Sequence, residues 1–156
     1  GTHTVQAAVE AAIDFDTGPV TLTPFAGLAG VHVKAESFTE TGGPAALTFD
    51  SASNTTGIST LGLRVSRVAG QVEISGAAAW RHAFGDVEPA SRAAFASAPA
   101  STFAVRGAPV SADALMLDAG VTARLDTSTT LTIGYSGEYA SGARDHGLRA
   151  ELRIEF

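Results

Sequence analysis

The last nine residues, Leu148 to Phe156, limit what this chain can fold into more than any other segment. Apolar side chains occupy every second position and charged side chains occupy the positions between them: Leu148, Ala150, Leu152, Ile154 and Phe156 against Arg149, Glu151, Arg153 and Glu155. A period of two predicts a β-strand with one apolar and one charged face. Such a strand suits a soluble sandwich with the apolar face in a core. It suits equally a membrane barrel with the apolar face toward lipid.

Similar alternation recurs along most of the chain and predicts about seven strands. The other runs cover residues 3–15, 20–33, 58–68, 71–84, 115–126 and 130–140. A helix is the alternative for residues 3–15, because Ala and Glu favour helices. In the second run the apolar residues change phase between Leu28 and Val31, which predicts a bulge at Gly27 to Gly30.

The connections between these runs alternate in length. Residues 16–19, 69–70 and 127–129 predict short turns, whereas residues 36–55 predict a long loop with a short strand at Ala45 to Phe49. Residues 85–114, rich in Pro, Ala and Ser, predict the longest irregular stretch. The turn at 141–145 is an exception, because it is short although the alternation predicts a long connection at this position. Short turns at one rim and long loops at the other are typical of outer-membrane barrels.

The composition supports a single β-domain that keeps apolar surface away from water. The 156 residues are 45% hydrophobic and only 17% charged, and no apolar run reaches the length of a membrane helix. Any membrane span must therefore consist of strands. The net charge of −6, without a basic cluster, argues against nucleic acid as a partner. The absence of cysteine excludes disulfides and thiol catalysis.

Seven motifs in order resemble the C-terminal translocator domain of bacterial autotransporters, the type V secretion proteins. They are LTPFAGLAG at 22–30, FTETGG at 38–43, STLGLR at 59–64, WRHAFGD at 80–86, FAVRGAP at 103–109, DALMLDAG at 113–120 and the final segment at 135–156. The resemblance implies a barrel of about twelve strands in the outer membrane of a Gram-negative bacterium. It also implies a helix through the lumen that joins an exported passenger. The expected fold class is therefore an all-β, antiparallel up-and-down meander of the transmembrane barrel type, with residues 1–156 as a C-terminal portion.

In a barrel of this kind the polar face of each strand would line the lumen, and charges of both signs could form ion pairs there. The predicted lumen-lining residues are Glu10, Arg64, Glu73, Arg81, Asp118, Arg124, Glu138, Arg149, Glu151 and Arg153, with Glu155 on the same face. Aromatic residues of the apolar face toward strand ends are predicted to form a girdle at the membrane interface. These residues are Trp80, Phe84, Tyr135 and Tyr139.

The sequence does not predict an enzyme. His82 lies near Arg81 and Asp86, but no nucleophile elbow accompanies it, so we expect a rim residue. Asp145 and His146 are adjacent, yet no group has metal-ligand spacing, and no metal or cofactor is expected.

The predicted function is that of an outer-membrane barrel segment supporting secretion of an attached passenger. The alternative is a soluble lipocalin-like or sandwich domain that binds a small apolar ligand. The expected partners are outer-membrane lipid, the passenger and the barrel assembly machinery. About seven strands leave two edges, so the run Val5 to Phe15 is expected to pair with another copy or to rearrange. The resemblance implies that Phe156, a terminal aromatic residue on an alternating strand, is the signal that the assembly machinery reads.

Overall fold

The computed structural model describes residues 1–43 and 45–155, which form twelve strands and no helix. This part of the chain therefore holds no helix that is long and apolar enough to cross a membrane. The strands are β1 (Thr2–Ala12), β2 (Phe15–Asp16), β3 (Thr21–Ala35), β4 (Phe38–Thr39), β5 (Leu47–Phe49), β6 (Ala52–Ala69), β7 (Val72–Gly85), β8 (Ala90–Phe95), β9 (Ala98–Arg106), β10 (Asp113–Arg124), β11 (Thr129–Ala140) and β12 (Arg144–Ile154).

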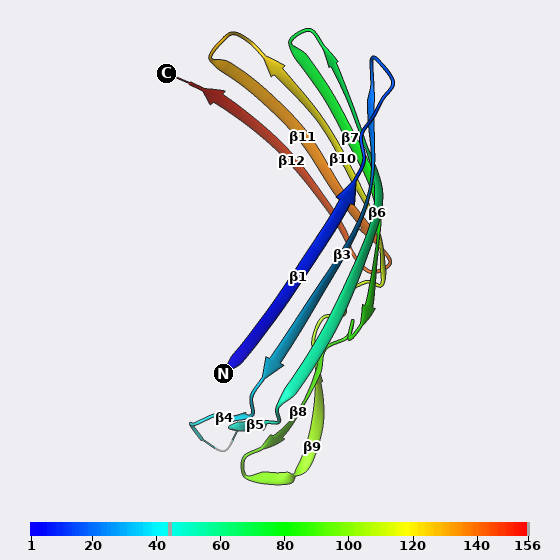
Figure 1. The fold of residues 1–156 in the computed structure, drawn as a ribbon. Helices are drawn as coiled ribbons and strands as arrows, with labels where there is room; N and C mark the ends of the chain where they lie inside the picture. Colours follow the sequence, from blue (N-terminus) through cyan, green and yellow to red (C-terminus); the bar gives the residue numbers. More distant parts are fainter. Residues whose placement is uncertain (44, 156) are drawn as a thin grey trace. The chain divides into compact units, whose positions relative to one another are not determined.

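Seven long strands form the larger sheet in the order in which they occur in the sequence (Figure 1). The order is β1-β3-β6-β7-β10-β11-β12, and the short β2 pairs with β3. Pairing is antiparallel between β7 and β10, between β10 and β11, and between β11 and β12. The predicted all-β, up-and-down meander of about seven strands is confirmed, and the helical alternative for residues 3–15 is wrong.

Two expectations for the first strands are wrong in detail. The run 3–15 is not one strand: β1 ends at Ala12, and β2 begins at Phe15. At this break the Ile13 N–H donates to the Pro24 carbonyl at 3.2 Å, whereas Pro24 has no N–H to return. The predicted bulge at Gly27 to Gly30 is also wrong, because β3 continues through it and exposure alternates in one phase. The apolar residues change faces there while the strand keeps a single phase of exposure.

The chain divides into two compact units. The first consists of residues 1–8, 29–58 and 83–110, and the second of residues 9–28, 59–82 and 111–156. Of the two long connections predicted from the sequence, residues 36–55 and most of 85–114 belong to the first unit, and the short turns belong to the second.

The first unit contains a smaller sheet in the order β4-β5-β8-β9. Its centre is the antiparallel pairing of β5 with β8, in which Leu47 lies opposite Phe95. The Phe38 and Phe49 rings stack at 4.7 Å between centroids. The predicted short strand at 45–49 is confirmed as β5. The loop prediction for the rest of 36–55 is partly wrong, because β6 begins at Ala52 and not at Ile58.

The prediction that residues 85–114 are irregular is wrong as well. They contain the hairpin of β8 and β9, with a register shift between Ala94 and Phe95. Ala, Ser and Thr give this segment little hydrophobic alternation. Its strands depend on pairing with β5, a partner far away in the sequence, and local pattern does not reveal such a partner.

Three tight turns close the hairpins at one end of the second unit (Figure 1). In the first, the Thr17 N–H donates to the Val20 carbonyl at 2.9 Å, and Gly18 adopts a φ of 91°, which suits glycine. In the second turn, Gly70 adopts a φ of 64°, which also suits glycine. In the third, the Ser128 N–H donates to Asp126 at 2.8 Å, and this hydrogen bond holds the pKa of the Asp126 carboxyl below its usual value.

Candidate functional site: the polar face of the larger sheet

The registers of β7, β10, β11 and β12 align residues of similar polarity in rows across the four strands. One row contains Ile74, Val121, Ile133 and Ala150, and the adjacent row contains Glu73, Thr122, Thr132 and Glu151. Successive residues of a strand point to opposite faces. The first row therefore belongs to an apolar face and the second to a polar face, and these names are used below for the two faces of the larger sheet.

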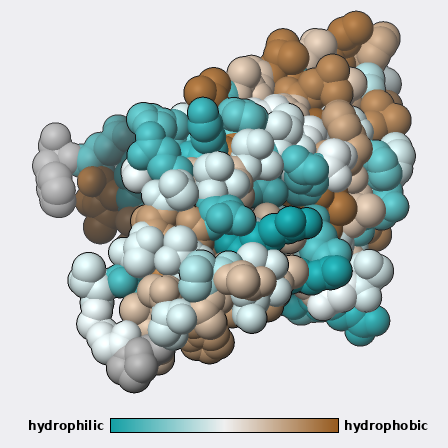
Figure 2. All heavy atoms as spheres, turned by 90° about the horizontal axis from the view of Figure 1, so that it is seen from below, coloured by the Kyte–Doolittle hydropathy of each residue, from teal (hydrophilic) through white to brown (hydrophobic). Residues whose placement is uncertain are grey.

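The apolar face exposes large hydrophobic side chains to an extent that water does not favour. Leu148 is 84% exposed, Leu152 is 58% exposed, and Ile133 is 52% exposed. In the view of Figure 2, hydrophobic residues gather along the upper margin, while hydrophilic residues fill a band across the middle. An exposed apolar face of this extent marks a surface that contacts lipid or another protein.

The predicted lumen-lining residues share the polar face. The registers align Glu73 and Arg81 of β7, Asp118 and Arg124 of β10, Glu138 of β11, and Arg149, Glu151 and Arg153 of β12. Glu10 of β1 and Arg64 of β6 meet each other on this same face. Arg64 lies over Phe25, and a Cβ placed on Gly62 would overlap both Phe25 and Ala79, a polar-face residue of β7.

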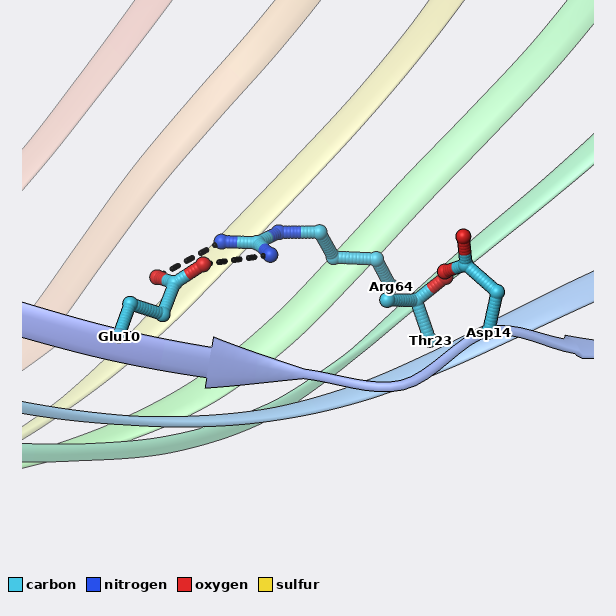
Figure 3. A network of polar contacts seen from close by, with 4 residues as sticks. All are labelled: Glu10, Asp14, Thr23 and Arg64. Carbon is cyan, nitrogen blue, oxygen red and sulfur yellow. Dashed lines mark hydrogen bonds and ion pairs between the residues drawn. The ribbon is translucent and has the colours of Figure 1, made fainter.

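The Glu10–Arg64 pair links two strands that are not neighbours (Figure 3). The two guanidinium nitrogens of Arg64 donate to the two carboxylate oxygens of Glu10 at 2.9 and 3.0 Å. The guanidinium also lies 3.8 Å from the centre of the Phe25 ring, which belongs to the intervening β3. Because Phe25 is buried and Gly62 has no side chain, the ring supports the arginine from below. We refer to Glu10, Phe25 and Arg64 as the three-strand clamp.

A hydrogen bond close to the clamp ties the start of β3 to the residues before it. The Thr23 hydroxyl donates to an Asp14 carboxylate oxygen at 2.6 Å (Figure 3). It fixes the segment at which β1 gives way to β2.

A second ion pair joins Arg81 of β7 to Glu138 of β11 across β10. The Arg81 Nε is the single buried side-chain nitrogen or oxygen in the described part of the chain that lacks a hydrogen-bond partner. The remaining predicted charges form no ion pair within residues 1–43 and 45–155. They are three arginines and three acids: Arg124, Arg149, Arg153, Glu73, Asp118 and Glu151.

A groove of about 730 Å³ lies over the polar face within the second unit. Small or hydroxyl-bearing residues form much of its floor, among them Ser75, Gly120, Thr132 and Gly134. Arg64, Asp118 and Arg149 also line it. The groove is therefore wide, and it combines hydroxyl groups and charges of both signs with apolar lining residues such as Val65 and Leu148.

The predicted girdle residues lie on the apolar face, where three of them, Trp80, Tyr135 and Tyr139, take part in polar clusters that the sequence did not reveal. The Trp80 Nε1–H donates to Asp113 at 2.9 Å, and the same carboxylate oxygen contacts His82 Nδ1 at 2.9 Å. Tyr139 lies near the end of β11, but Tyr135 lies in the middle of it. Phe84, in the first unit, covers Gly57, where a Cβ would overlap the ring.

The histidines considered from the sequence have other neighbours in the structure. His82 contacts Asp113, whereas Asp86 accepts the Thr55 N–H at 2.7 Å. Asp145 lies opposite Glu138 on the polar face, and the adjacent His146 lies opposite Gly137 on the apolar face. Neighbouring side chains that point to opposite faces cannot hold one metal ion together.

The family model of the autotransporter β-domain matches residues 1–136. This chain belongs to the autotransporter β-domain family. It is also similar to two proteins of Serratia marcescens, each named extracellular serine protease. The identities are 34% and 33% over 158 aligned residues. Each alignment covers 99% of this chain and 15% of the relative, so the chain spans only a small part of their length.

An autotransporter β-domain is a translocator in the outer membrane and not an enzyme, and it serves the secretion of a passenger domain. The sequence-based prediction of fold class and function is thus confirmed. The soluble apolar-ligand alternative has no support. The proteolytic activity in the relatives' names cannot be assigned to the matched segment from these alignments, because it covers so little of each protein.

We predict that the clamp contributes to stability as a coupled unit. Glu10→Gln and Arg64→Gln should each lower the urea midpoint of unfolding in lipid vesicles, and the double variant should lose less than the sum. Arg153→Gln, which removes a polar-face charge without an ion-pair partner, should change the midpoint little. Strictly additive losses in the double variant would show that the pair contributes nothing through mutual contact.

Proposed function

We propose that this autotransporter β-domain segment forms one side of a translocation barrel, with its polar face toward the lumen and its apolar face toward lipid. The exposure of Leu148, Leu152 and Ile133 on one face, opposite a face with both signs of charge, is the observation that supports this orientation most strongly. In the reverse orientation at least six unpaired charges would contact hydrocarbon, at a cost of several kcal/mol.

The polar face suits the passage of an unfolded chain because it has little uncompensated charge that would bind the chain. Glu10 and Arg81 have ion-pair partners on their own face, Arg64 and Glu138, so these charges are already compensated. The six charges without such partners comprise three of each sign and cancel in sum. A passing segment therefore meets water, hydroxyl groups and balanced charge, and this favours movement over binding.

Residues 1–156 are proposed to be one β-domain portion that depends on further strands to complete a barrel. In the larger sheet, β1 and β12 each have a neighbour on one side only among the described residues. Unpaired backbone groups in hydrocarbon cost several kcal/mol each. Each edge therefore requires a partner strand, from elsewhere in the parent protein or from a second copy, and Val5 to Phe15 is the run we expect to recruit a copy.

The barrel assembly machinery is the proposed partner of the C-terminal edge. β12 ends at Ile154 and is exposed throughout, so its outer backbone groups are open to pairing. Phe156, the predicted signal, lies outside the described residues. In the sequence it continues the apolar series of β12, so main-chain pairing and a pocket for the ring could act together.

The orientation is tested by adjacent substitutions on opposite faces of β12. Leu152→Arg should destabilise the protein in lipid vesicles by about 2–4 kcal/mol if the side chain lies near the bilayer midplane, and Arg153→Leu by much less. Folding titrations in vesicles measure both costs. The reverse order of the two costs would reject the orientation.

The open edges predict association of the isolated segment. Residues 1–156 in mild detergent should scatter light as oligomers, and Val9→Pro in β1 should shift them toward smaller species, because proline blocks strand pairing. A monodisperse monomer with a closed barrel would be incompatible with the two edges.

The role of Phe156 is tested in the parent protein. Deleting it should reduce the amount of assembled barrel in cells, because the machinery loses the ring it reads. Refolding of the purified protein in detergent, where no machinery acts, should remain nearly unchanged. Equal assembly in cells with and without Phe156 would refute the proposed signal.

A further inference from the structure

The apolar face carries a polar cluster at the beginning of β12. The Tyr135 hydroxyl lies 2.8 Å from the Tyr139 hydroxyl and 2.8 Å from His146 Nδ1. The Tyr139 ring meets the His146 ring edge to face, with centroids 5.1 Å apart. A Cβ on Gly137 would approach the Tyr139 ring to 3.1 Å and the Tyr135 hydroxyl still more closely. Glycine at this position thus lets both tyrosines lie against the sheet.

Arg144 lies next to this cluster on the same face and adds a positive charge there. It lies opposite Tyr139 in the register of β11 and β12, on the same face as His146. Arg144 is exposed and forms no ion pair with any described residue. The nearest acids in sequence do not reach it from this face, because Asp145 and Glu138 belong to the polar face. Asp113, which is on the apolar face, already accepts from Trp80 and contacts His82.

The cluster has a surplus of donors. If the Tyr139 hydroxyl donates to Tyr135 and the Tyr135 hydroxyl donates to His146 Nδ1, the Nε2–H of His146 remains to donate outward. The guanidinium of Arg144 adds five N–H groups in a geometry that matches phosphate oxygens. A ligand that compensates this surplus must therefore be an anion with several acceptor oxygens.

The position of the cluster indicates where such an anion comes from. β11 runs from the short turn at 125–128 to the turn at 141–143, so the cluster lies at the rim opposite the short turns (Figure 1). In outer-membrane barrels the short turns face the periplasm, and this rim lies at the outer leaflet. Leu148 and Ala150 follow on the same face, and Leu148 lies about 13 Å along the strand from Arg144. A charged group followed by apolar surface at this spacing matches a lipid headgroup and its chains.

We propose that Arg144 and His146, supported by the hydroxyls of Tyr135 and Tyr139, bind the phosphate of an anionic lipid in the outer leaflet. The inference rests on the proposed orientation of the apolar face toward lipid. It adds to that orientation a specific lipid contact, which holds the β11–β12 hairpin at a fixed depth in the membrane.

The test uses the full parent protein purified from outer membranes, with native mass spectrometry to measure binding of dihexanoyl phosphatidic acid. Arg144→Gln should weaken this binding about tenfold, as expected for loss of a charge-assisted contact. Arg144→Lys should retain part of it, and His146→Gln should weaken it less than Arg144→Gln. Arg149→Gln, on the same strand but on the polar face, should leave it unchanged. Heat-dependent gel mobility shows that each variant is folded.

Two further probes separate the contribution of the phosphate to binding from that of the acyl chains. Dihexanoylglycerol, which lacks the phosphate, and inorganic phosphate, which lacks the chains, should both bind much more weakly than phosphatidic acid. Equal binding of inorganic phosphate would indicate a site for free anions and overturn the proposal. Equal binding by Arg144→Gln and the unmodified protein, or equal weakening by Arg149→Gln, would overturn it as well.

The orientation itself has a separate readout. Brominated lipids should quench the fluorescence that Trp80→Phe removes, because Trp80 belongs to the apolar face. Quenching together with an ineffective Arg144→Gln would overturn the lipid contact and leave the orientation standing. Absence of quenching would reject the orientation and the lipid contact together.

Discussion

The constraint on which this structure depends is the pairing of backbone groups in hydrocarbon. Lipid offers no hydrogen bonds, so each N–H and C=O within the membrane must find a partner in another strand. A meander satisfies this requirement for every strand except those at its ends, which are β1 and β12 in the larger sheet. In the proposed orientation the period-two alternation follows from the sheet itself, because one face of each strand would meet lipid and the other would meet water.

The polar face contains charges that compensate one another across strands. In the three-strand clamp, Arg64 reaches over Phe25 to a strand that is not its neighbour in the sheet. Arg81 and Glu138 do the same across β10. Both pairs are at least partly exposed, so each contributes modestly to stability, but both connect strands two positions apart and resist local shearing. The ion pairs can therefore stabilise the larger sheet while the groove over its polar face stays open.

Much of this fold was predictable because a strand whose two faces meet different environments has apolar and polar residues at alternate positions. The run from Leu148 to Ile154 is the clearest case, and the faces of β10 and β11 follow in the same way. The smaller sheet was missed because β5 and β8 hold each other in place across a long sequence separation. The support of Arg64 by Phe25 depends on how three strands align, and the pairing of His82 with Asp113 depends on the register of β7 and β10. Periodicity within one strand contains no information on either.

The pairing of β5 with β8 also has a consequence for the order of events during folding. β6 and β7 lie between these two short strands in the sequence, so the ends of a long loop must meet before Leu47 can lie opposite Phe95. Joining β6 to β7 as a hairpin shortens this loop and lowers the entropy lost on closing it. We therefore expect the smaller sheet to form late in folding, after the β6–β7 hairpin has closed.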